Sequence, residues 1–232
     1  MIRLHVAADL IAGSAIQATE GQAHYAGGVM RRTVGDAVRL FNGRDGEWIA
    51  RIAALSRGKA IFAVETPLRP QAADADLWLM FAVLKRDGTD MVVQKATELG
   101  VSALLPVFTE RTNAGRVNTA RLQAIAIEAT EQSERLTVPA IHPPRDLHDE
   151  LVVWPPARTL FVALERAEAP PLGPFAGPAG LLTGPEGGFG SRDLAVLDAC
   201  AFVRPVSLGP RILRAETAAI AGLALLQAPG WG

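Results

Sequence analysis

The chain has 232 residues, which is enough for one large domain or two small ones. Hydrophobic residues make up 49% and charged residues 20%, as in an ordinary globular protein, and aromatic residues contribute only 6%. The net charge of −1 excludes a strongly basic nucleic-acid binder, so any contact with RNA must use a local basic patch.

The first third of the sequence is predicted to be rich in β-strands. A helix is favoured at residues 22–31, and turn residues at 42–46 and 56–58 punctuate the sequence after it, because Asn, Asp and Gly tolerate left-handed backbone. The strand candidates are residues 37–41, 47–55 and 59–65. Closely spaced strands with short turns predict a small barrel.

A proline-containing stretch ends this β-rich region. Pro67 and Pro70 disfavour both helix and regular strand, and residues 71–76 are small and polar. We therefore expect a domain boundary near residue 72, which divides the chain into residues 1–71 and 72–232.

Strands and helices alternate in the remainder of the chain. Gly100 terminates one expected helix and Asn118 is placed to cap the next. The expected strands are residues 77–84, 103–108, 160–164, 180–183 and 203–208, and the expected helices are residues 89–99, 118–133, 145–154, 191–200 and 215–228. This alternation predicts an α/β fold with a parallel sheet that is covered on both faces.

The numbers and spacing of the cysteine and histidine residues argue against a disulfide within the chain and against a zinc site. Cys200 is the single cysteine, and no pair among the four histidines has the spacing of a zinc site. The N-terminal residues lack the features of a signal peptide, and the longest apolar helix candidate, residues 215–228, is too short to cross a bilayer. We expect a cytoplasmic protein without a bound metal.

The segment Leu181 to Gly190, with the sequence LLTGPEGGFG, lies between a predicted strand and a predicted helix. Its glycines let the backbone approach a ligand closely, and ligands of parallel sheets sit at the carboxyl ends of strands. A tight strand-to-helix turn explains the spacing equally well. The P-loop lysine is missing, and only the first half of a dinucleotide fingerprint is present, with Asp193 placed to repel a pyrophosphate.

A second segment, residues 208–218, repeats the arrangement of a strand, a Gly-Pro pair and a helix. Two such turns at successive strand ends would form neighbouring walls of one pocket, in which Ile212 and Leu213 offer contacts to a flat ring. Arg214 and Glu216 are equally well explained as a solvated helix start, where Glu216 complements the helix dipole.

Both segments resemble the signature of the family that methylates N3 of uridine 1498 in the 16S rRNA of the small ribosomal subunit. Residues 93–101 resemble the first helix motif of this family. Residues 131–139 resemble its central motif, and residues 29–43 are similar to its barrel segment. The match covers most of the chain, in order.

The resemblance implies a fold and a set of partners. Residues 1–71 would form a PUA-like RNA-binding β-barrel, and residues 72–232 a SPOUT domain whose C-terminal segment threads a deep trefoil knot. The expected cofactor is S-adenosylmethionine, and the expected substrate is rRNA within the assembled small subunit. Enzymes of this class act as homodimers, with each active site completed across the interface.

The resemblance also suggests roles for individual residues. The expected cofactor-binding residues are Leu164, Leu182, Thr183, Gly184, Glu186, Gly187, Gly188, Leu208, Gly209, Ile212 and Leu213. Arg214 is the candidate for stabilising the uracil anion, and Glu98 and Glu216 are candidate proton acceptors, although both also fit ordinary helix positions. The candidates for RNA contact are Arg31, Arg32, Lys95 and Arg135.

The sequence departs from the family pattern in its basic stretches. Residues 84–90 contain Asp87 and Asp90 where the family is more basic, Glu134 replaces a glycine, and Thr137 replaces an arginine. These departures affect the expected grip on RNA and leave the cofactor motifs intact. Two other functions therefore stay open: a SPOUT enzyme with a different RNA target, and a non-catalytic RNA-binding dimer.

Overall fold

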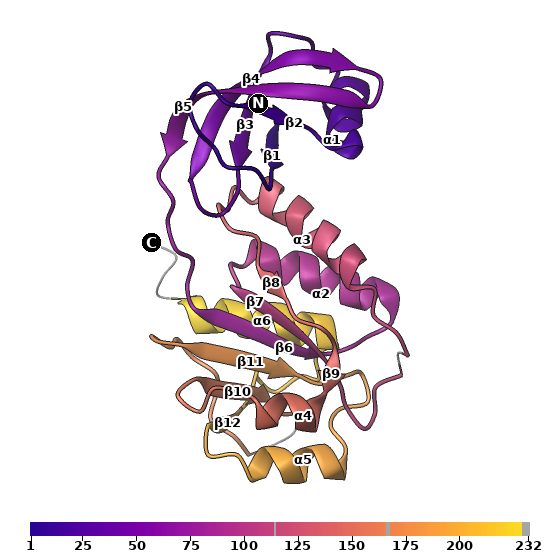
Figure 1. Ribbon diagram of the computed structural model, residues 1–232. Helices are drawn as coiled ribbons and strands as arrows, with labels where there is room; N and C mark the ends of the chain where they lie inside the picture. Colours follow the sequence, from indigo (N-terminus) through magenta and orange to yellow (C-terminus); the bar gives the residue numbers. More distant parts are fainter. Residues whose placement is uncertain (114, 166–167, 229–232) are drawn as a thin grey trace. The chain divides into compact units, whose positions relative to one another are not determined.

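The computed structural model describes residues 1–113, 115–165 and 168–228 (Figure 1). They fall into two compact units, Met1–Ala73 with Thr130–Val138, and Asp74–Ala129 with Pro139–Gly232. The sequence predicted a single boundary, between residues 1–71 and 72–232. It did not predict that residues 130–138 belong to the first unit.

The first unit is built on a five-stranded sheet in the order β1-β3-β4-β5-β2. The strands are β1 (Arg3–His5), β2 (Ala15–Gln17), β3 (Ala37–Phe41), β4 (Glu47–Ser56) and β5 (Lys59–Arg69). All neighbours are antiparallel except β1 and β3. Buried Ala60, Phe62 and Val64 alternate along β5 with more exposed residues, as expected for a strand with one face in a core.

Two predictions for this unit need correction. Residues 66–69 continue β5, although the prolines were expected to end it. Pro67 is tolerated because the end of β5 that contains it is at an edge of the sheet, since β2 pairs only with residues 61–63. On its other side Pro67 pairs with Trp48 of β4, next to an irregularity in the pairing of the two strands. The predicted helix at 22–31 is a short helix, α1 (Glu20–His24), followed by a π-helical turn, Tyr25–Val29.

A buried ion cluster fastens residues 130–138 to the first unit. Glu47 is fully buried, and its carboxylate accepts from Arg3 and, at 2.8 Å, from Arg69. Arg3 also donates to the carbonyl oxygens of Thr130, at 2.8 Å, and Arg135. Removing one partner of such a buried pair costs about 3–5 kcal/mol, so this cluster is a strong local anchor.

The second unit contains a parallel sheet in the order β12-β10-β11-β6-β7-β8, and β9 also pairs with β7. Its strands are β6 (Leu77–Ala82), β7 (Ala103–Phe108), β8 (Ala140–Ile141), β9 (Arg145–Asp146), β10 (Thr159–Ala163), β11 (Ala179–Thr183) and β12 (Val203–Val206). Every residue of β11 is buried, as is typical of a strand in a parallel sheet covered on both faces.

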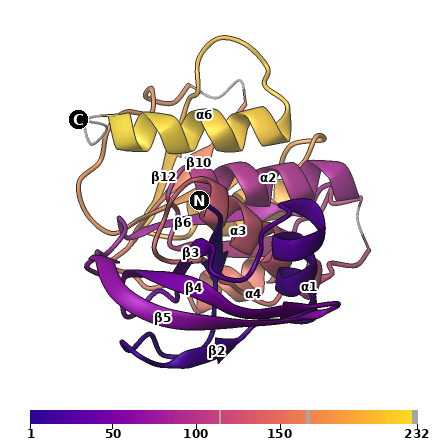
Figure 2. The same ribbon diagram turned by 90° about the horizontal axis from the view of Figure 1, so that it is seen from above.

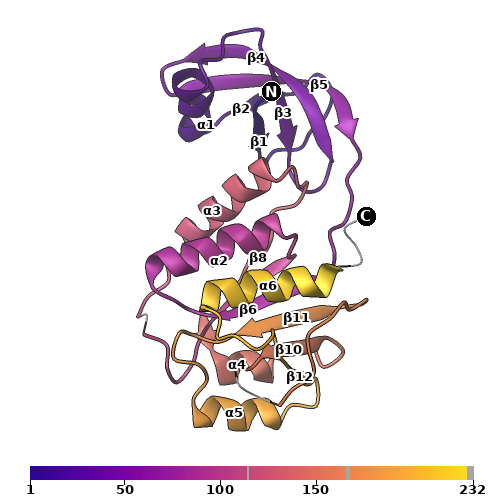
Figure 3. The same ribbon diagram turned by 180° about the vertical axis from the view of Figure 1, so that it is seen from behind.

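Helices cover both faces of this sheet, as the alternation of elements predicted. The helices of this unit are α2 (Arg86–Glu98), α4 (Leu147–Val152), α5 (Ser191–Asp198) and α6 (Ala215–Gln227). A further helix, α3 (Thr119–Gln132), begins in this unit, and its last three residues belong to the first. Figures 1 and 3 show α6 on one face and α4 with α5 on the other, and Figure 2 shows α2 beside α6. The sheet is thus the middle layer of the second unit.

Local hydrogen bonds explain where several helices begin. Asn118 accepts from the backbone of Arg121, as a predicted N-cap should. The helix predicted at 145–154 is shorter, because Asp146 caps it at its start while residues 145–146 pair with β7. Ser191 is the first residue of α5, and Gly190 takes the cap position before it.

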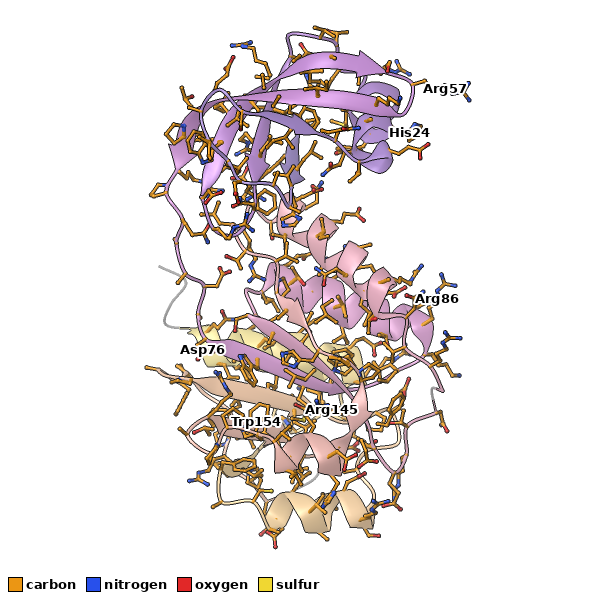
Figure 4. All side chains as sticks on the ribbon, viewed as in Figure 1. His24, Arg57, Asp76, Arg86, Arg145 and Trp154 are labelled. Carbon is orange, nitrogen blue, oxygen red and sulfur yellow. The ribbon has the colours of Figure 1, made fainter. Side chains whose placement is uncertain are left out.

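Arg158 ties together the beginnings of β6, β10 and β11, at the amino edge of the sheet. Its guanidinium donates to the carbonyl oxygens of Asp76, at 3.0 Å, and Ala179, at 3.1 Å, and pairs with the Asp76 carboxylate. It also lies over the ring of Trp78. Figure 4 marks Asp76 at this edge. The opposite, carboxyl edge carries the candidate site.

Candidate active site

A cavity of about 960 Å³ opens at the carboxyl ends of three adjacent strands, β10, β11 and β12. Most of its wall comes from residues 163–165, 184–189 and 207–213, which end or follow these strands. The two Gly-Pro segments of the sequence therefore form neighbouring walls of one cavity. This is the place where ligands of open parallel sheets bind.

Gly188 and Gly209 form an open cradle in these walls. Their φ angles are +67° and +108°, in a region that residues with side chains rarely adopt. A Cβ atom at either position would meet no atom within 4 Å, so a side chain there would enter open space beside the cavity wall. The absence of side chains leaves room for a ligand against the backbone.

Hydrogen bonds from a neighbouring loop hold the glycine-rich turn in place. Asp193, which is 5% exposed, accepts from the backbone of Gly190 at 2.9 Å and from the backbone of Glu110 at 3.2 Å. The Glu110 carboxylate accepts in turn from the backbone of Arg192 at 3.0 Å. Asp193 thus positions the loop, whereas the sequence suggested only that it would repel a pyrophosphate.

Arg111 is a wall residue that the sequence reasoning missed. It follows β7, and its Nη1 donates to the carbonyl oxygen of Gly187 at 2.9 Å. The two residues are 76 positions apart, so no local pattern connects them. The available signal was a charged pair, Glu110-Arg111, one residue after a buried strand whose carboxyl end lies on the same edge of the sheet.

Most of the residues predicted to bind a cofactor line this cavity: Leu164, Gly184, Glu186, Gly187, Gly188, Leu208, Gly209, Ile212 and Leu213. Leu182 and Thr183 are not part of the wall. They belong to β11 and are 0% and 2% exposed, so they support the loop from within the sheet.

The three candidates for catalysis are not brought together. Arg214 is exposed at the start of α6 and is absent from the cavity wall, although its neighbours Leu213 and Ala215 line it. Glu216 is half-buried in the first turn of α6, also outside the wall. Glu98 lies on α2, where its carboxylate accepts from Lys95 at 2.8 Å.

The candidates for RNA contact lie in different environments. Arg31 is exposed in the first unit, with a φ of +51°, and Arg32 beside it is half-buried. Lys95 is paired with Glu98 on α2. Arg135 is only 9% exposed, because residues 130–138 pack into the first unit, so its guanidinium is not displayed for phosphate as the sequence suggested.

The cavity wall contains charges of both signs, with Arg111 and Arg211 as cations and Glu165 and Glu186 as carboxylates. Within residues 1–113, 115–165 and 168–228, no three His, Cys, Asp or Glu side chains are grouped so as to hold a metal ion. The same residues contain no helix that is both long and apolar enough to span a membrane.

Comparison with protein families identifies both parts of the chain. Residues 71–227 match the RNA methyltransferase domain, and residues 18–65 match the RNA methyltransferase PUA domain. Ribosomal RNA small subunit methyltransferase E of Rickettsia conorii is 33% identical over 98% of this chain and 96% of its own length. The protein of the same name from Synechocystis is 34% identical over 97% of this chain and 77% of its own length.

Solved structures resemble the chain over its whole length. Ribosomal RNA small subunit methyltransferase E from Neisseria gonorrhoeae, bound to S-adenosyl methionine, is 29% identical with a TM-score of 0.89, covering 99% of this chain and 98% of its own. A Legionella pneumophila protein solved with bound cofactor SAM is 27% identical, also with a TM-score of 0.89, covering 98% and 97%. From its sequence, fold and cavity, the chain belongs to the ribosomal RNA small subunit methyltransferase E family, with an RNA methyltransferase domain preceded by a PUA domain.

Proposed function

We propose that this protein transfers the methyl group of S-adenosylmethionine to N3 of a uridine in 16S rRNA, at position 1498. The observation that carries the proposal is the glycine cradle of Gly188 and Gly209 in the cavity at the carboxyl edge of the sheet. Family membership supports the reaction class, and the two solved relatives with bound cofactor support the identity of the ligand.

The residues of the cavity fit this cofactor. The open space at Gly188 and Gly209 admits a ligand against the backbone, and Ile212 and Leu213 offer apolar contact to an adenine ring. Glu186 supplies negative charge beside a positively charged ligand. When bound, S-adenosylmethionine supplies an electrophilic methyl group on a sulfonium, and the protein supplies orientation and electrostatics.

The residues of this chain must then present uracil and stabilise its charge. The base has to be unstacked to reach the cavity, and its N3 has to lose a proton before it can accept the methyl group. An arginine stays protonated, so it stabilises the resulting anion and cannot be the base. We propose Arg214 as one arginine for this role, since it directly precedes the wall residue Ala215.

Assembly and location form a second part of the proposal. A homodimer through the second unit is supported by α6, where Ala218, Ala221 and Leu225 stay partly exposed. A trefoil knot is supported by the likeness to relatives and by β11 lying between β6 and β10, which precede it in the chain. The exposed Arg31, with Arg32 beside it, would contact RNA phosphate, and the protein would act in the cytoplasm on assembled small subunits.

The decisive experiment supplies labelled S-adenosylmethionine and this protein to small subunits purified from a strain that lacks the enzyme. The methyl group is then mapped by nuclease digestion and mass spectrometry. The expected product is N3-methyluridine at one position, and subunits from the parent strain, which are already modified, should accept almost none.

Other products would overturn specific parts of the proposal. A methyl group on ribose or on another base would reject the uridine target. Absence of any transfer by a protein that binds the subunits would instead support a non-catalytic RNA-binding role.

A further inference from the structure

We propose that Arg111 contacts the target nucleotide at the rim of the cavity and stabilises the negative charge on uracil after N3 loses its proton. This inference rests on the proposed function and adds to it a residue that neither the motifs nor the sequence reasoning singled out. Four observations carry it: the strand from which Arg111 comes, the hydrogen bonds that fix its turn, the N–H donors that its guanidinium keeps available, and the distribution of charge in the wall.

The origin of Arg111 places it at the side of the cavity. The main walls follow β10, β11 and β12, which are adjacent in the sheet. Arg111 follows β7, which is separated from β11 by β6, and no other wall residue in the described part of the chain comes from this side. We infer that this side is left to the second substrate, since the glycine cradle for the cofactor lies in the main walls.

The turn that carries Arg111 is fixed before any substrate arrives. Thr112 closes it, because its hydroxyl accepts from the backbone of Thr109 at 2.9 Å and its own backbone donates to the Thr109 carbonyl at 3.1 Å. Asp193 accepts from the backbone of Glu110 and ties the turn to the glycine loop. Such preorganisation is what stabilisation of a developing charge requires.

The guanidinium of Arg111 is held by one bond and keeps donors for another ligand. Nη1 donates to the carbonyl oxygen of Gly187, and no other hydrogen bond of this side chain occurs among the residues that the structure describes. A guanidinium has five N–H donors, so most of them stay available to an acceptor at the cavity rim. Arg211, the other cation of the wall, is exposed and makes no hydrogen bond among the same residues, so nothing fixes its position.

The charges of the wall residues and of the two substrates favour a contact between Arg111 and the target nucleotide. The sulfonium of the cofactor is positive and would be repelled by a guanidinium, whereas the carboxylates Glu165 and Glu186 in the same wall suit it. The cofactor also carries a carboxylate, so the measured cofactor affinity of the Arg111 variants has to show that this group is not the partner of Arg111. Uracil becomes negative when N3 is deprotonated, and an arginine near its carbonyl oxygens lowers the energy of that anion. Of the two cations in the wall, Arg111 is the one held in place by a hydrogen bond, and its charge matches the second substrate.

The test compares Arg111→Ala and Arg111→Lys with the control Arg192→Ala, which removes another exposed arginine from the start of α5, outside the cavity wall. Calorimetry measures cofactor affinity, and single-turnover methylation of small subunits at saturating cofactor measures transfer across neutral to alkaline pH. For Arg111→Ala we expect a loss of transfer rate of about 10²-fold at neutral pH, with unchanged cofactor affinity. The loss should shrink as pH rises, because alkali favours the same anion that Arg111 stabilises.

Two further variants test whether the effect depends on the charge and the position of Arg111. Arg111→Lys keeps the charge and should recover part of the rate, and Arg192→Ala should behave as the wild type. If cofactor affinity falls while the rate at saturation is unchanged, Arg111 only shapes the Gly187 turn and the inference is wrong. A loss that is equal at every pH also rejects it.

The activity of the wild-type protein distinguishes a failure of this inference from a failure of the proposed function. An active wild type with a fully active Arg111→Ala rejects the role of Arg111 alone. An inactive wild type rejects the proposed function, and the inference falls with it.

Discussion

Single glycines in the site serve two different physical purposes. Gly188 and Gly209 combine a positive φ with open space, so they admit a ligand to the backbone. At Gly190 a Cβ atom would collide with the Glu110 carboxylate, so this glycine allows two loops to pack together. A glycine-rich motif alone does not separate these roles, because both leave the same letter in the sequence.

Replacing Gly188 with asparagine tests the cradle with little backbone strain, because asparagine tolerates a left-handed conformation. The new side chain should occupy the ligand's space and weaken cofactor binding by at least about tenfold, or roughly 1.4 kcal/mol. Calorimetry with S-adenosylmethionine measures the change. The matched control is Gly35→Asn in the first unit. Gly35 also has a positive φ, +92°, and a Cβ atom there would meet no atom within 4 Å. If a folded Gly188→Asn variant binds the cofactor as tightly as the wild type, Gly188 does not form part of the cofactor site.

Asp45 makes the stability of the first unit depend on acid pH. The backbone N–H of Leu10, at 2.9 Å, and then the amide of Asn42, at 2.6 Å, hold the pKa of Asp45 below its ordinary value. Because the folded pKa is lower, the unfolded state binds more protons in acid. The stabilisation is present above the unfolded pKa, about 3.9, and is lost as pH falls through the folded pKa.

Asp45→Asn should therefore unfold with a weaker dependence on pH than the wild type in the acid range. Urea titrations at a series of acidic pH values measure the free energy of unfolding of both proteins. At neutral pH the variant should be the less stable one, because a neutral amide accepts a weaker hydrogen bond from Leu10. Parallel pH curves for the two proteins would contradict this account.

At the scale of elements, the second unit depends on close packing of Trp154 against β11. The indole is 3% exposed, its Nε1 donates to the carbonyl oxygen of Arg158 at 2.9 Å, and its ring lies edge-on to Trp78. Figure 4 labels it near α4. A Cβ at Gly180 of β11 would lie 2.5 Å from this rigid ring, so the strand needs glycine there.

Gly180→Ala should destabilise the protein by about 1–3 kcal/mol, as overpacking of a core usually does. This sign is opposite to the usual benefit of replacing glycine inside a regular element. Thermal unfolding measures the effect. In a Trp154→Phe background the same change should cost less, because the smaller ring leaves room, and a double-mutant cycle gives the coupling. Additive effects would show that the two residues do not interact.

At the scale of the whole molecule, α6 has more apolar surface than its own sheet covers. Ala219, Leu223 and Leu226 are buried, whereas Ala221 is partly exposed and Leu225 is 38% exposed. A helix that is apolar on nearly all sides is normally buried on nearly all sides. A second copy of the chain would cover the remaining face.

Light scattering should therefore give twice the mass of one chain at micromolar concentration. Leu225→Glu should shift the protein to the monomer, because it places a charge in the apolar contact. Ile61→Glu, at a 40% exposed position in the first unit, is the control and should stay dimeric. A stable wild-type monomer would reject the dimer.

Much of the molecule was determined by local sequence. Apolar periodicity and turn residues were sufficient to place β3, β7, α5 and α6 within a few residues, and the two Gly-Pro segments predicted the walls of one cavity. These features depend on residues close together in the chain, where hydrophobic period and capping chemistry operate. The family resemblance likewise used short motifs in their order.

Tertiary structure alone decided which distant residues meet. It placed Arg111 against Gly187, returned residues 130–138 to the first unit, and buried Arg135 and Leu182. The three-residue strands β1 and β2 are too short to show a period, and pairing with β3 and β5 defines them. Such contacts depend on closing long loops and on competition for buried space, and neither leaves a local pattern in the chain.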